Sequence, residues 1–105
     1  MLNKVQLIGR LGKNPEVQYI AADTQVARFS LATSEYYKTK EGEQKELLEW
    51  HNIVAWRNLA KYAESHLVRG LLVYIEGHLQ TRHWTDKNQI ERYTTEIIAD
   101  NILIL

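Results

Sequence analysis

The chain has 105 residues, of which 45% are hydrophobic and 25% are charged, a balance typical of one small globular domain over residues 1–105. Its 13 basic residues are matched by 13 acidic residues, so a polyanion would have to be bound by clustered cations or by uncharged contacts. The absence of cysteine excludes disulfides and thiolate sites, and no apolar run reaches membrane-spanning length. We therefore expect a cytoplasmic protein with no membrane partner.

Alternation of apolar and polar residues predicts the first two strands. The first strand covers residues 5–11, is interrupted at Asn14-Pro15 and resumes at residues 17–19. A second strand is predicted over residues 25–34. The more apolar face of this second strand consists of Ala27, Phe29, Leu31 and Thr33.

A long polar hairpin is expected over residues 35–48, because charged residues surround a single glycine there. The third strand follows over residues 49–56. Trp50 and Trp56 are six residues apart in it, so their side chains leave the same face of the strand. Spacing alone does not decide whether this face is buried or exposed.

Helical spacing replaces alternation after the third strand. Apolar and aromatic residues share one face over residues 59–67, Asn58 suits an N-cap, and Gly70 suits a C-terminal stop. Strand patterns then return over residues 71–80 and 92–101. The helix therefore lies between the third and fourth predicted strands.

A second polar hairpin, residues 81–91, joins the last two strands and contains Trp84. The order of elements is three strands, one helix and two strands. This order predicts an all-β fold with one helix, namely the OB-fold, a five-stranded Greek-key barrel with its helix between strands three and four.

Large aromatic residues occur on a strand face and in both hairpins. They are Tyr36, Tyr37, Trp50, Trp56 and Trp84. Such side chains can stack on any nucleic-acid base, because every base has a π-face, and each stacked base contributes roughly 1–3 kcal/mol. The alternative is that they are core or interface residues. Trp84 and Tyr37 fit this alternative least, because polar hairpins offer little core to enter.

Several segments resemble the bacterial single-stranded DNA-binding protein family, in the family's order and over nearly the whole chain. They are Asn3–Gly12, Pro15–Val17, Leu31–Glu35, Glu49–His51, Tyr74–Gly77 and Tyr93–Glu96. The resemblance implies an OB-fold homotetramer that binds and protects single-stranded DNA without sequence preference. It also implies a role in replication, recombination and repair, and association with the bacterial nucleoid.

The resemblance further implies roles for individual residues. Four aromatic residues match base-stacking positions of the family: Tyr37, Trp50, Trp56 and Trp84. Tyr37 replaces a common tryptophan and Trp56 a common phenylalanine, and both keep an aromatic face. His51 and Tyr74 match positions at subunit interfaces. The basic residues expected to contact phosphate groups, from position or from their place beside the aromatic residues, are Lys4, Arg10, Lys38, Arg57, Arg82 and Lys87.

Other motifs indicate no further chemistry. The four histidines, His51, His66, His78 and His83, lack the paired spacing of a metal site. There is no cysteine nucleophile and no nucleophile elbow, so we expect neither an enzyme nor a cofactor. Gly9 and Gly12 match the GXXG string of KH domains but follow a strand, so we interpret them as sites of tight bending.

The family commonly continues into a flexible tail whose acidic tip recruits replication and repair proteins. The sequence ends at Ile102–Leu105 without such a tail, so we expect these partners to require residues outside this sequence. A short, tailless and dimeric primosomal replication protein of the same fold is an alternative. An OB-fold module that binds only proteins is another, but it leaves Trp84 and Tyr37 without a role.

Overall fold

The computed structural model describes residues 1–105 and consists of six strands and one helix. The elements are β1 (Val5–Leu11), β2 (Glu16–Ala21), β3 (Thr24–Lys38), β4 (Gln44–Trp56), α1 (Asn58–His66), β5 (Leu72–Thr85) and β6 (Glu91–Ile104). The predicted order is confirmed, with β1 and β2 as the two halves of the interrupted first strand. The single helix is too short and too polar to cross a membrane.

The strands form one sheet in the order β1-β5-β6-β4-β3-β2, and an additional pairing of β1 with β3 closes it. Arg10 pairs with Ala32 in this closure. The contact between β4 and β6 is parallel, and the other pairings are antiparallel. This closed Greek-key arrangement confirms the predicted OB-fold.

The core fills the barrel interior and continues under α1. Leu31, Ile53 and Ile75 are almost fully buried on the inner faces of three strands. Ala60 and Ala63 bury one face of α1 against the same cluster. The apolar face predicted for the second strand is confirmed at Ala27, Phe29 and Leu31, which are all buried.

Gly9 and Gly12 both permit close contacts. Gly9 lies within β1, which corrects its interpretation as a bend, whereas Gly12 directly follows β1 in a bend, as predicted. Neither Gly9 nor Gly12 has a positive φ. A Cβ atom at Gly9 would collide with the backbone of Ala32 where β1 passes over β3. A Cβ atom at Gly12 would lie 2.5 Å from Cζ3 of Trp50. Gly9 therefore requires glycine because the backbone of Ala32 occupies the space of a side chain, whereas a side chain at Gly12 would displace the exposed ring of Trp50.

The ends of α1 differ from the sequence prediction. Asn58 is the first helical residue, and the N-cap position belongs to Arg57, which has φ 54° and no side-chain cap. The Arg57 N–H donates to the carbonyl of Gln25, so the turn is fixed by β3 and not by a capping side chain. The helix ends at His66, and Gly70 lies beyond it in a turn with φ 86°.

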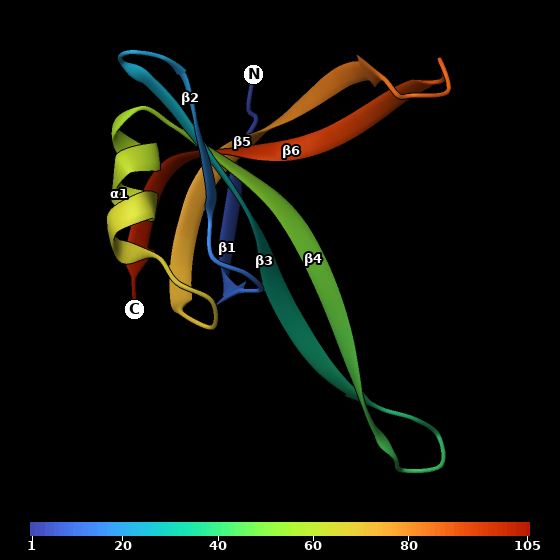
Figure 1. Ribbon diagram of the computed structural model, residues 1–105. Coiled ribbons are helices and arrows are strands. Elements are labelled where there is room, and N and C mark those ends of the chain that lie inside the picture. Colours follow the sequence, from blue (N-terminus) through green and yellow to red (C-terminus); the bar gives the residue numbers. More distant parts are fainter.

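Two long hairpins extend from the barrel and diverge from each other (Figure 1). The β3–β4 arm remains paired as far as Lys38 and Gln44, and the β5–β6 arm as far as Thr85 and Glu91. The predicted loops over residues 35–48 and 81–91 are therefore mostly strand. Both faces of a two-stranded ribbon meet water, so its sequence lacks the alternation by which a half-buried strand is recognised.

Candidate nucleic-acid interface

Trp50 and Trp56 lie on the outer face of β4, opposite Ala32 and Val26 of β3. They alternate with Ile53 and Ala55, whose side chains enter the core. Their exposed fractions are 54% for Trp50 and 39% for Trp56, so neither is a core residue. The shared face expected from their spacing is confirmed, and it is accessible to a ligand.

The β5–β6 arm supplies the third tryptophan. Trp84 is paired with Arg92 and is 41% exposed. Its Nε1 donates a 2.8 Å hydrogen bond to Oγ1 of Thr94, and the guanidinium carbon of Arg82 lies 6.0 Å from the ring centroid. These contacts fix the orientation of the ring while leaving part of its surface open. A fixed, half-exposed ring loses little rotamer entropy when a base stacks on it.

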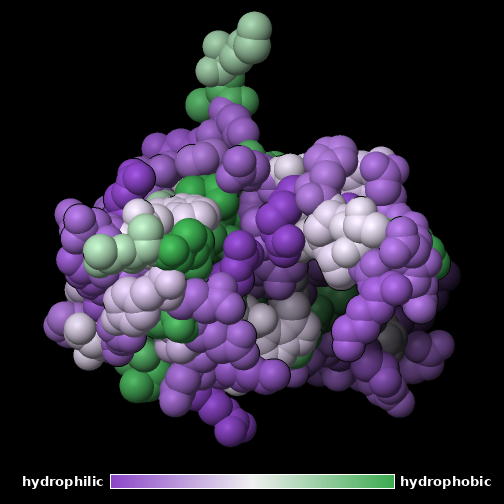
Figure 2. Space-filling view, turned by 45° about the horizontal axis from the view of Figure 1, so that its top comes forward, coloured by the Kyte–Doolittle hydropathy of each residue, from purple (hydrophilic) through white to green (hydrophobic).

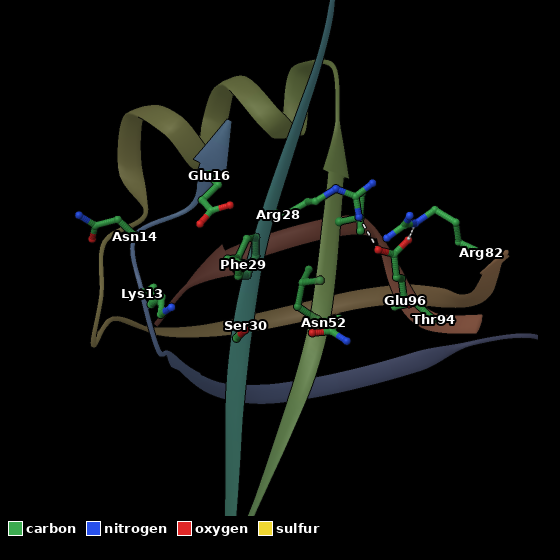
Figure 3. Close-up of a pocket in the computed structure, with 12 residues that line it drawn as sticks. Lys13, Asn14, Glu16, Arg28, Phe29, Ser30, Asn52, Arg82, Thr94 and Glu96 are labelled. Carbon is green, nitrogen blue, oxygen red and sulfur yellow. Dashed lines mark hydrogen bonds and ion pairs between the residues drawn. The ribbon is translucent and has the colours of Figure 1, made fainter. Parts of the chain in front are cut away.

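A groove lies between the outer face of β3–β4 and the β5–β6 arm. Its cavity has a volume of about 290 Å³, and polar side chains dominate its lining. Lining residues include Lys13, Arg28, Asn52, Arg82, Thr94 and Glu96 (Figure 3). The space-filling view shows a largely hydrophilic face, hollowed right of its centre, with hydrophobic side chains in separate groups (Figure 2).

Glu96 of β6 carries the main electrostatic feature of the groove. Its side chain is only 8% exposed, and its Oε2 pairs with Nη1 of Arg28. Its Oε1 lies 3.5 Å from Nε of Arg82. A carboxylate this buried needs a partner, because burial of an unpaired charge is costly. Here it has two, and both arginine side chains remain more than one third exposed.

Sequence reasoning missed Arg28 and Glu96 as members of the site. Arg28 was visible as a cation on the polar face of its strand, opposite Val54 in the paired structure. Glu96 gave no such signal, because its partner Arg28 is 68 residues away in the sequence. Asn52 and Ser30 were missed as well, and they face each other across β3 and β4 within the groove.

Comparison with known proteins agrees with this geometry. The model of the single-strand binding protein family matches residues 2–105. The chain belongs to this family. A solved structure described as "Plasmodium falciparum SSB complex with ssDNA" has 36% sequence identity and a TM-score of 0.88. The match covers 100% of this chain and 96% of that chain.

Membership in the single-strand binding protein family confirms the resemblance stated from the sequence. It also confirms the expectation of a binding protein and not an enzyme, because the family is non-enzymatic. No group of three or more histidine, aspartate or glutamate side chains is arranged to hold a metal ion.

The tyrosines of the β3–β4 arm lie on opposite faces of the ribbon. Tyr36 is 63% exposed and Tyr37 is 54% exposed. By alternation, Tyr36 shares the outer face with Ala32 and Trp50, whereas Tyr37 lies on the other face with Lys45 as its partner. Tyr37 and the exposed Lys38 therefore lie along the arm, outside the groove that Trp50 and Trp84 flank.

The other predicted phosphate contacts are spread over the surface. Arg57 is exposed and directly follows Trp56 at the end of β4, and Lys87 lies in the exposed turn of the β5–β6 arm. Arg10 donates a 3.0 Å hydrogen bond to the carbonyl of Gly70. Lys4 lies 3.6 Å from Glu76. Neither Lys4 nor Arg10 lines the groove.

The turn that holds Lys87 is organised by Asp86. Its Oδ1 accepts hydrogen bonds from the N–H groups of Ile90 at 3.0 Å and Asn88 at 2.8 Å. Its Oδ2 accepts from Nε of Arg92 at 2.9 Å. The Ile90 N–H, then Arg92, then Asn88 hold the pKa of the Asp86 carboxyl below its ordinary value. The tip of the arm is therefore ordered by an ionised carboxylate.

The two residues expected at subunit interfaces lie away from the groove. His51 is half-buried, and its Nε2 lies 2.9 Å from Oγ1 of Thr33. Tyr74 donates to Oε2 of Glu76 at 2.8 Å and accepts from Nε2 of Gln6 at 2.9 Å. His51 lines a second hollow, which Gln6 and Ile8 also line.

Proposed function

We propose that this chain binds single-stranded DNA without sequence preference. Bases stack on Trp50, Trp56 and Trp84, and phosphate groups pair with nearby guanidinium groups. The observation that carries this proposal is the groove itself, which has arginines within it and exposed tryptophans on β4 and β5, the strands that carry its lining residues Asn52 and Arg82. The solved relative, whose description names a complex with single-stranded DNA, supports the same ligand.

Stacking has to supply much of the affinity, because the groove carries little net charge. Its charged lining residues are three cations, Lys13, Arg28 and Arg82, and two anions, Glu16 and Glu96, which leaves a net charge of +1. Each stacked base contributes roughly 1–3 kcal/mol, so three tryptophans can hold several nucleotides. Stacking does not discriminate strongly between bases, and this accounts for binding that tolerates any sequence.

The remaining expected contacts extend this path beyond the groove. Tyr37 and Lys38 on one arm, and Lys87 on the other, are exposed to a strand that leaves the groove in either direction. Arg57 continues the path beside Trp56. Lys4 and Arg10 do not line the groove, but Arg10 pairs with Ala32, which pairs with Trp50, so a strand that passes Trp50 can extend toward Arg10.

We further propose that the chain forms a homotetramer and serves replication, recombination and repair. An apolar strip outside the groove supports self-association: Ile8 pairs with Tyr74, and Tyr74 pairs with Leu103. Ile8 is 57% exposed and Leu103 is 50% exposed. His51 and Tyr74 would lie at the subunit contacts, where their hydrogen bonds hold them in defined orientations.

Titration with poly(dT) while tryptophan fluorescence is recorded tests the proposed function. We expect strong quenching, because bases stack directly on the tryptophan rings. The Trp84→Ala variant should bind with a free energy weaker by about 1–3 kcal/mol and should still fold, since Trp84 is not a core residue. The matched control is Tyr93→Ala, because Tyr93 pairs with His83 on the opposite face of the same arm.

Two results would contradict the proposal. Unchanged tryptophan emission at saturating poly(dT) would remove stacking as the binding mechanism. Equal losses of affinity in the Trp84→Ala and Tyr93→Ala variants would mean that the arm contributes its overall shape and not a stacking face.

A further inference from the structure

Two guanidinium groups share one carboxylate at the floor of the groove. Arg28 reaches Glu96 from β3, and Arg82 reaches it from β5, so three strands meet at this point (Figure 3). The side chain of Glu96 is 8% exposed, whereas those of Arg28 and Arg82 are 38% and 46% exposed. The carboxylate is therefore inside the protein, and both cations face the solvent of the groove.

One carboxylate neutralises only one of the two guanidinium groups. The trio of Arg28, Arg82 and Glu96 keeps a net charge of +1, and the two cations repel each other. An oxyanion that contacts both would remove this repulsion. Each guanidinium has five N–H donors and uses only part of them on Glu96, so donors remain for a second anion. The planar fork of arginine matches the two free oxygens of a phosphodiester.

The surroundings of the trio favour a ligand site over a purely structural ion pair. The Arg28–Val54 strand pair lies between the pairs of Trp50 and Trp56, next to that of Trp56, so an anion here lies between two base-stacking rings. Arg82 also lies 6.0 Å from the ring centroid of Trp84, on the other side of the groove. A nucleotide whose base stacks on one of these rings would bring its phosphate toward the two guanidinium groups.

We propose that Arg28 and Arg82 together bind one phosphodiester of single-stranded DNA and that Glu96 positions them for this contact. Arg28 and Arg82 are binding residues because they touch the phosphate, and Glu96 is a positioning residue because it acts through them. This inference rests on the proposed function, since the phosphodiester belongs to the bound strand. It differs from two independent phosphate contacts, because both arginines share one phosphate.

Salt dependence of binding distinguishes one shared phosphate from two separate ones. For single strands, log K falls as log salt concentration rises. The steepness of this decline, called the slope below, decreases by about 0.7 for each phosphate that the protein no longer neutralises. The probe is an oligo(dT) of about 16 nucleotides, the upper limit for one OB-fold. We expect Arg28→Gln and Arg82→Gln each to weaken binding at 50 mM salt and to leave the slope unchanged, because one arginine still holds the phosphate. The double variant should lower the slope by about 0.7, and Lys61→Gln on α1 is the control for removal of a charge outside the groove.

The role of Glu96 is tested by repeating the cycle in the Glu96→Gln background. In the original background, the slope decreases only in the double variant, so the effects of Arg28→Gln and Arg82→Gln on the slope are not additive. We expect this non-additivity to disappear in the Glu96→Gln background, because the two guanidinium groups are no longer held together. If the carboxylate were purely structural, Glu96→Gln would lower the melting temperature and leave the non-additivity between the two arginine substitutions intact. If Arg28→Gln does not fold, Arg28→Lys is used in its place. Lysine keeps a cation beside Glu96 but lacks the planar guanidinium, so this variant should fold and bind oligo(dT) more weakly.

Distinct results would overturn this inference and the proposed function. Slope decreases of about 0.7 in each single variant and about 1.4 in the double variant would show two separate phosphates and reject the shared site. Unchanged oligo(dT) affinity in a folded Arg28→Gln variant would reject Arg28 as a binding residue. Both results leave DNA binding itself intact. Absence of oligo(dT) binding by the unmodified protein would instead reject the proposed function and, with it, the shared site.

Discussion

At the scale of single residues, Arg57 is one of two non-glycine residues with a positive φ. Its φ is 54° and its ψ is −115°, a region in which a residue with a Cβ atom costs on the order of 1–3 kcal/mol. Its N–H donates to the Gln25 carbonyl at 2.9 Å, and its carbonyl accepts from Lys61 at 3.0 Å, so the surrounding structure fixes the turn. A cation kept at a strained position beside Trp56 fits the proposed phosphate contact.

Arg57→Gly should therefore separate stability from binding. Glycine adopts this conformation without strain but is more flexible in the unfolded chain, so we expect the free energy of unfolding to rise by about 1 kcal/mol. Affinity for oligo(dT) should fall, because the cation is removed. Urea unfolding and fluorescence titration measure the two effects. Arg57→Ala is the control, since it removes the charge and keeps the Cβ atom. A less stable Arg57→Gly variant would show that the turn carries no strain.

At the scale of elements, the tip of the β5–β6 arm depends on the ionised form of Asp86. The folded pKa of Asp86 is lowered, so its contribution is present above its unfolded pKa of about 3.9 and is lost as pH falls through the folded pKa. The Ile90 N–H is the largest cause, ahead of Arg92. The tip should therefore loosen as the pH falls below the ordinary pKa of aspartate.

An NMR titration of the Asp86 carboxyl checks this order of causes. We expect a midpoint below the ordinary aspartate value in the unmodified protein. In Arg92→Ala the midpoint should rise only part of the way, because the Ile90 N–H still favours the ionised carboxylate. A complete return to the ordinary value would assign the lowering to Arg92 alone.

Some elements of the structure could be predicted from the sequence and others could not. Strand faces such as Ala27, Phe29 and Leu31 were predictable because one face is buried and alternation records it. The arms were not predictable as strands, because both faces of a two-stranded ribbon are exposed to water and burial imposes no alternation on its sequence. The three tryptophans were recognisable as candidates by residue type and position. The pairing of Glu96 with Arg28 was not, because only closure of the barrel brings residues 68 positions apart together.

At the scale of the whole molecule, the arms make the protein more extended than a compact domain of its length. The radius of gyration is 15.9 Å, against about 13 Å expected for a compact chain of this size. The longest dimension is 56 Å. Paired strands that project from a barrel bury little surface of their own. Bound DNA or neighbouring subunits would supply the contacts that the arms lack.

Sedimentation of the free protein tests its assembly, and we expect a mass of about four chains. Ile8→Lys should lower this mass, because a charge in the apolar strip of Ile8, Tyr74 and Leu103 would be desolvated in a subunit contact. Ile20→Lys is the matched control, since Ile20 is 62% exposed on β2 and lies outside the strip. A stable mass of two chains in the unmodified protein would favour the primosomal alternative.

The position of β6 in the sheet has a consequence for synthesis on the ribosome. β6 is translated after the other strands of the barrel, yet it lies between β4 and β5 in the closed sheet. Until its residues emerge, β4 and β5 each keep an unpaired edge, and unpaired edges promote aggregation. The nascent chain therefore cannot close its barrel gradually, and the groove is completed only when Thr94 and Glu96 of β6 take their places.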